Sequence, residues 1–188
     1  MTLLALDSRW QRLMDPDYVS AGGKTFGGLV DIGFEAPDAW PHATPAETGE
    51  EVVELGADKL SADLCRLDDT HYLRVILPLP VRGAEEAALF SLWAAVSPED
   101  FARYLADWQG TAEAPFTTAP AWLMTDLPGY ESDTPLHGTL TAQDEGVPRL
   151  TLDGTEPLAA AQAEGISFDA LLDLYAALGT DLRPHLKG

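Results

Sequence analysis

The polar side chains best suited to form a site gather in one punctuated stretch, residues 126–137. The stretch reads DLPGYESDTPLH and follows a tryptophan by four residues. It combines carboxylates, a phenol and an imidazole, which bind polar ligands and transfer protons, and loops of this kind have functional roles more often than regular elements do. One arginine lies across the hairpin that we predict next along the chain. The candidate binding residues are therefore Trp122, Asp126, Tyr130, Asp133, His137 and Arg149, and we assign no catalytic residue.

The same stretch has a purely structural interpretation, which stays open. Trp122 and Tyr130 can serve as core or covering residues, because large aromatic side chains dominate packing energetics. The acidic and hydroxyl side chains can satisfy the backbone of the turns.

Other catalytic and metal chemistries find little support in the sequence. Cys65 is the only thiol, so no intramolecular disulfide forms, and its apolar strand-like surroundings predict a buried, unreactive side chain. The four histidines are scattered, which does not fit a zinc site, and there is no Gly-x-Ser-x-Gly elbow or calcium loop. The segment Gly23-Lys24-Thr25 lacks the spacing and the flanking strand of a phosphate-binding loop. We expect no metal and no cofactor.

The charge is strongly negative, with 31 acidic residues against 11 basic ones and a formal net charge of −20. Such a surface repels nucleic acid and anionic membranes, whereas it attracts a basic protein over long range. The alternative is that the acidic residues serve solubility alone. The beginning of the chain does not resemble a signal peptide, and no apolar stretch approaches the roughly 20 residues of a membrane span. We expect a cytoplasmic protein.

The clearest secondary structure is a strand over 89–96 followed by a helix over 98–108. Ser97 is a good N-cap, and Pro98 suits the first helical position. An apolar stripe then follows at helical spacing, and Gly110 can end the helix. We assign the tryptophans of this segment, Trp93 and Trp108, to the core.

The remaining pattern predicts an α+β fold with an antiparallel sheet built from hairpins, with helices packed on it, in a single domain. Residues 1–54 are expected to form an N-terminal helix (near 3–13), a glycine-rich loop (22–28) and a surface connection (37–51), all packed on a core domain of residues 55–188. That core has hairpins over 63–79 and 136–153, a short segment at 121–127, and helices over 157–164 and 168–178.

Several pieces of the sequence resemble the bacterial domain of unknown function 2199 family. They are Leu60-Ser61-Ala62-Asp63-Leu64-Cys65, Leu92-Trp93-Ala94-Ala95-Val96-Ser97, Ala121-Trp122-Leu123, Leu127-Pro128-Gly129-Tyr130 and Gly165-Ile166-Ser167, within residues 55–178. The resemblance implies a small, soluble, cytosolic bacterial protein of a family without an established activity. The chain departs from the family at Asp15 to Gly28, which lacks the family's cysteine pair, and at Glu156, where the family usually has histidine.

Two functional hypotheses follow. The first is a non-enzymatic interaction or inhibitor-like protein that presents its acidic surface to a basic partner. The alternative is a small-molecule-binding protein or enzyme with a pocket near the loop from Asp126 to His137. The sequence does not determine the oligomeric state.

Overall fold

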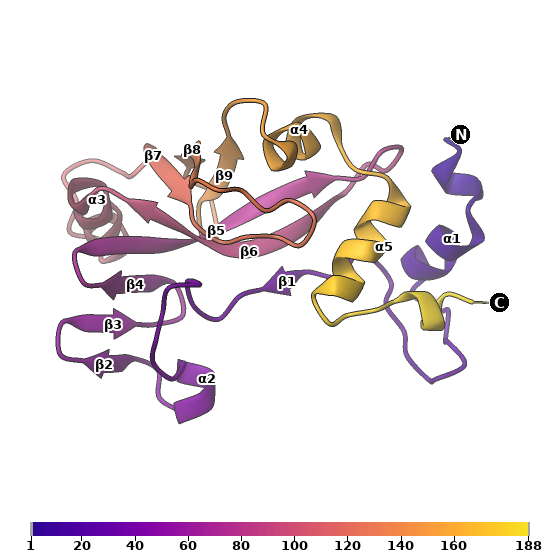
Figure 1. Cartoon of the computed structure of the whole chain (residues 1–188), viewed down its shortest axis with the longest axis horizontal. Helices are drawn as coiled ribbons and strands as arrows, with labels where there is room; N and C mark the ends of the chain where they lie inside the picture. Colours follow the sequence, from indigo (N-terminus) through magenta and orange to yellow (C-terminus); the bar gives the residue numbers. More distant parts are fainter. Residues whose placement is uncertain (1, 188) are drawn as a thin grey trace.

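The fold is organised around one long hairpin. The structure, a computed structural model, describes residues 2–187. Strands β5 (Thr70–Pro80) and β6 (Ala87–Val96) pair antiparallel along their whole length, from His71 opposite Val96 to Pro80 opposite Ala87. In Figure 1 they run along the molecule from the side of α3 to the turn near α5, and α1 and both termini lie beyond that turn. The predicted strand at 89–96 is thus confirmed as most of β6.

Five strands close into a small barrel. The order β6-β7-β8-β9-β5 returns to β6, with β7 (Thr118–Leu123), β8 (Leu136–Thr141) and β9 (Arg149–Leu152). The closing contact between β5 and β9 is parallel, and the N–H of Ile76 donates to the carbonyl of Pro148 at 2.9 Å. The α+β single domain is confirmed. Most strand pairs are antiparallel, but the sheet closes into a mixed barrel and is not the expected antiparallel sheet built from hairpins. Local hairpin signals cannot show that β9 meets β5, whose residues lie far away in sequence.

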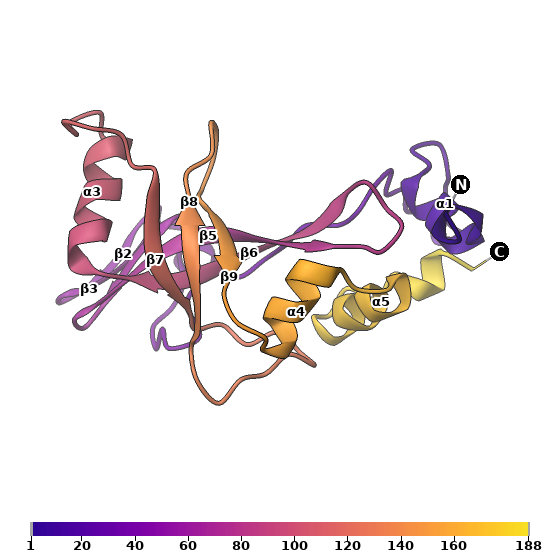
Figure 2. The same ribbon diagram turned by 90° about the horizontal axis from the view of Figure 1, so that it is seen from above.

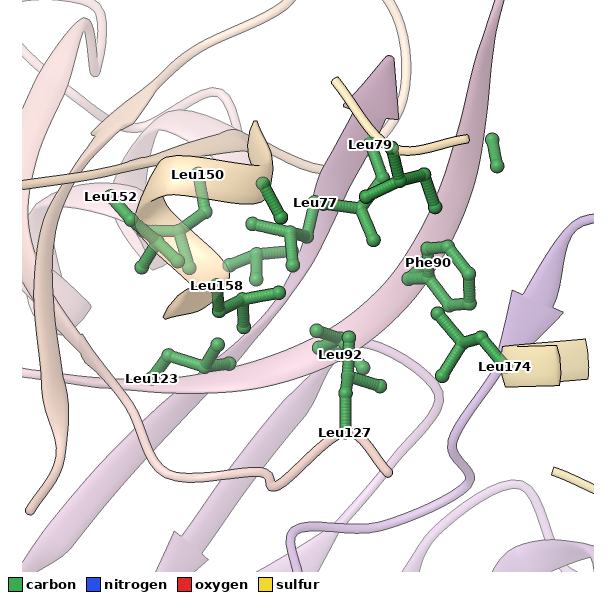
Figure 3. Close-up of a cluster of buried hydrophobic side chains, with 14 of the residues drawn as sticks. Leu77, Leu79, Phe90, Leu92, Leu123, Leu127, Leu150, Leu152, Leu158 and Leu174 are labelled. Carbon is green, nitrogen blue, oxygen red and sulfur yellow. The ribbon is translucent and has the colours of Figure 1, made fainter. Parts of the chain in front are cut away.

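The main core fills the inside of the barrel and continues under the C-terminal helices α4 (Pro157–Glu164) and α5 (Phe168–Ala177). Alternate side chains of each strand point inward, as the period of a β-strand requires. On β5 these are Leu73, Val75 and Leu77, each fully buried. Figure 3 shows leucines from four barrel strands meeting side chains of the helices and of Leu127.

A three-stranded extension continues the sheet from β5 beyond the barrel: β4 (Leu64–Leu67), β3 (Asp58–Leu60) and β2 (Val53–Leu55). One face of it packs into a second, smaller core that includes Trp40, Leu60 and Trp93. The indole N–H of Trp93 donates to the carbonyl of Phe34 at 2.9 Å. The core assignment of Trp93 is therefore confirmed.

The other elements lie around the barrel and its extension. They are a 3-10 turn η1 (Leu4–Leu6), α1 (Ser8–Met14), β1 (Ile32–Gly33, parallel to β6), α2 (Pro45–Thr48), α3 (Pro98–Trp108) and η2 (Arg183–His185). Figure 2 places both termini at one end of the molecule and α3 at the other. None of the helices within residues 2–187 is long and apolar enough to cross a membrane.

Candidate functional site

Helix α3 packs on the sheet incompletely. Ser97 caps it as predicted, since its Oγ accepts from the N–H of Asp100 at 3.0 Å, yet no residue of the helix is fully buried. Its first turns lie on the protein, where the ring of Phe101 contacts that of His71 in a tilted arrangement, 4.8 Å between ring centroids. The last turn ends at Trp108, which is 69% exposed. The expectation that Trp108 is a core residue is therefore wrong.

A two-lobed cleft lies between α3 and the sheet extension. The lobes have volumes of about 450 and 430 Å³, within the range of about 300–1,000 Å³ typical of ligand sites. Both are open to solvent and lined mainly by apolar surface. They share the residues Val52, Ser61, Leu64 and Trp108, so the cleft is continuous under the exposed indole.

The first lobe, called the acidic lobe, is bordered by Glu50, Glu51 and Asp63 and has no lysine or arginine in its lining. Both glutamates are exposed and form no ion pair within residues 2–187. The carboxylate of Asp63 lies 3.7 Å from Nε of Arg74, which is a long distance for an ion pair. This lobe therefore offers unpaired negative charge beside apolar surface.

The second lobe, called the basic lobe, is lined by Lys59, Arg66 and His71. Lys59 pairs with Glu54 at 2.5 Å, and both side chains are more than half exposed. Nε of Arg66 donates to the carbonyl of Ala57 at 2.8 Å, and its guanidinium forms no ion pair within residues 2–187. Nδ1 of His71 is buried without a hydrogen-bond partner in the same part of the chain.

The reactive groups near the cleft are held in their neutral forms. Burial raises the pKa of the Cys65 thiol to about 12, and the charge of Asp58 adds to the effect. Burial also raises the pKa of Tyr104, with further contributions from Asp63 and Asp107. A thiol that stays protonated is a poor nucleophile, and residues 2–187 contain no cluster of three or more His, Cys, Asp or Glu side chains able to hold a metal.

The structure divides the six residues that the sequence analysis selected. Asp126, Tyr130 and Asp133 line a hollow of about 130 Å³ within their loop. Trp122 and His137 face each other across β7 and β8 on the outside, 5.4 Å apart, and Nδ1 of His137 lies 2.6 Å from Asp153. Arg149 is exposed on β9 and does not line the hollow. The hollow has less than a third of the volume of either cleft lobe.

Sequence reasoning missed two features of these sites. Thr125, next to Asp126, is only 4% exposed, lines the hollow, and its Oγ1 has no partner within residues 2–187. A threonine in an apolar stretch gives no sign of this. The cleft was missed because the stripe of α3 was interpreted as core. The sequence feature that could have indicated the cleft is the occurrence of an acidic residue directly before an apolar one at Glu51-Val52 and Asp63-Leu64.

The structure is therefore that of a small α+β protein with a closed five-stranded barrel, an extension of the sheet on one side, and an open apolar cleft with charged residues at its border. Residues 19–166 match the family described as "Uncharacterized protein conserved in bacteria (DUF2199)". The chain belongs to this bacterial family, as the resemblance in its sequence predicted. The match begins earlier than that resemblance, at residue 19, and so includes the acidic border of the cleft. No curated protein and no solved structure matches the chain.

Proposed function

We propose that this protein is a non-enzymatic binding module that holds an apolar, positively charged segment of a partner protein in the cleft beside α3. The observation behind the proposal is the exposed Trp108 above a continuous apolar cleft with an acidic border. Tryptophans that close over apolar pockets are typical hot spots of protein interfaces.

The charge of the chain supports a basic partner. With a formal net charge of −20, the protein steers cations toward its surface, and the carboxylates of Glu50 and Glu51 fix where they bind. The apolar surface of the cleft then supplies most of the affinity, because rim charges affect association rates more than they affect binding energy.

The test uses a defined probe: a short synthetic peptide with two lysines followed by leucine and phenylalanine, blocked at both ends and fluorescently labelled. We expect Trp108→Ser to weaken binding about 30-fold, since hot-spot residues contribute about 2 kcal/mol or more. Trp122→Ser removes another exposed indole, which does not line the cleft, and should leave binding unchanged. Equal loss in both variants, or no binding by the wild type, would refute the proposal.

A matched pair of charge reversals tests the acidic border. Glu50→Lys/Glu51→Lys should weaken binding about tenfold at low salt and little at high salt. Glu85→Lys/Glu86→Lys makes the same change of net charge in the exposed turn between β5 and β6, which Figure 2 places at the end of the molecule away from α3. Equal effects of the two pairs would mean that the border has no special part in binding.

A second candidate function is the binding of a small polar molecule in the hollow of the 126–137 loop. Its support is the unpartnered Oγ1 of Thr125 beside the carboxylates of Asp126 and Asp133. A thermal-shift screen against metabolites tests it, because a ligand at a hundred times its dissociation constant adds about 2.7 kcal/mol of stability. A stabilising ligand whose effect persists in Thr125→Val would place its site elsewhere.

A further inference from the structure

The basic lobe is unusual in so acidic a chain. Only 11 of the 188 residues are lysine or arginine, and two of them, Lys59 and Arg66, line one lobe together with His71. The acidic lobe on the other side of the shared residues has no such cation. The lining of the cleft is therefore asymmetric: its lysine and arginine side chains all lie in one lobe, and the glutamates that form no ion pair within residues 2–187 border the other.

The polar groups of the basic lobe have hydrogen-bonding capacity to spare. Nδ1 of His71 is buried and has no partner within residues 2–187, and a buried polar atom without a partner is unfavourable. Arg66 uses Nε for the carbonyl of Ala57, which leaves the other guanidinium nitrogens for a ligand. The pair of Lys59 with Glu54 is solvent-exposed and weak, so Lys59 can change partners at little cost.

A carboxylate suits this lobe, because it accepts hydrogen bonds from a guanidinium and an ammonium together. Nδ1 of His71 is buried below the surface of the lobe, and a turn of the imidazole ring would bring an N–H to the same carboxylate. Both lobes open to solvent, so a chain can pass through the cleft and need not end there. This favours an acidic side chain over a terminal carboxylate.

Resting on the proposed function, we infer that the bound segment has a fixed direction and three parts. Its basic residues lie against Glu50 and Glu51, its apolar side chain lies under Trp108, and a glutamate or aspartate side chain lies in the basic lobe against Arg66 and His71. The partner is thus recognised by an ordered pattern of basic, apolar and acidic residues.

The test compares blocked peptides that differ in one group. Each peptide has two lysines, then an apolar centre, then a single glutamate, and the distance from the centre to the glutamate differs between peptides. Each of these peptides has a twin with glutamine in place of the glutamate. We expect the best glutamate peptide to bind the wild type about tenfold tighter than its glutamine twin. Arg66→Gln/His71→Phe should lose the preference and bind the glutamate peptide no more tightly than its glutamine twin. His71→Phe keeps a ring against Phe101, and on its own it should reduce the preference in part.

The outcomes separate the inference from the proposed function. If the wild type binds both twins equally, the inference is overturned, while the proposed function stands. If a glutamine peptide with a free terminal carboxylate binds tighter than the glutamate peptide, the side-chain assignment is overturned. If no peptide binds more tightly to the wild type than to Trp108→Ser, the proposed function fails and the inference with it.

Discussion

The close pairing of β8 with β9 in the barrel requires glycine at position 138, because there is no room for a Cβ there. A Cβ built at this position would lie 2.5 Å from the carbonyl oxygen of Thr151 and 2.9 Å from Cδ1 of Leu150. Ordinary contacts begin near 3.4 Å, so β8 must move from β9 by about 0.9 Å. The nearest atom belongs to the backbone and cannot rotate away. Overpacking costs about 1–3 kcal/mol, and we expect Gly138→Ala to lose about 3 kcal/mol, at the upper end.

The assay is urea unfolding with linear extrapolation, supported by the melting temperature, which should fall by about 6–12 °C for a protein of this size. Gly33→Ala in β1 is the matched control, because its Cβ would meet nothing closer than Ser91 at 3.7 Å. It should change the free energy of unfolding by less than about 0.5 kcal/mol. If Gly138→Ala is as stable as Gly33→Ala, β8 and β9 do not approach as closely as described.

Three further outcomes are expected. Ser97→Ala removes the cap of α3 and should cost about 1 kcal/mol in urea unfolding; an unchanged midpoint would contradict the capping role. Cys65, buried and with its pKa raised to about 12, should resist a thiol reagent at pH 8 in the native protein and react once urea unfolds the chain; rapid native labelling would show that it is accessible. Burial also raises the pKa of Tyr175 to about 12. As the pH rises, the thiol of Cys65 and the phenol of Tyr175 therefore lose their protons in the unfolded chain before they do so in the folded one. The free energy of unfolding should fall as the pH rises from about 9 toward 12. Cys65→Ala should make that fall shallower, and an identical slope would refute this cause.

Much of the fold could be predicted because its signals are local. Ser97 and Ser167 both cap helices as expected, accepting from Asp100 and Ala170 respectively, and the predicted strands alternate as the buried positions require. Barrel closure was not predictable in this way, because the pairing of Ile76 with Arg149 joins residues far apart in sequence. Strands of two or three residues, such as β1 and β2, are too short for a periodic pattern.

The candidate site was harder to predict than the fold, because the type of a polar or aromatic residue does not show on which face of a strand or helix its side chain lies. Trp122 and His137 form a cross-strand pair on the outside of the barrel, while Asp126 lies in the loop between their strands. The stripe of α3 has the same spacing whether or not a partner covers it. Only the position of the helix over the sheet distinguishes the half-buried Phe101 from the exposed Trp108.

The sheet extension links the second core to the cleft. Strands of three or four residues are only marginally stable by themselves, and β2, β3 and β4 are held by packing of one face, where Leu60 and Cys65 are buried with Trp93. On the other side, the open cleft is lined by Val52, just before β2, and by the partly buried Leu64 of β4, which also packs against the main core. An apolar wall exposed to water contributes nothing to folding until something covers it. Val52 is 36% exposed and Trp108 is 69% exposed, and the bound segment that we propose would cover both.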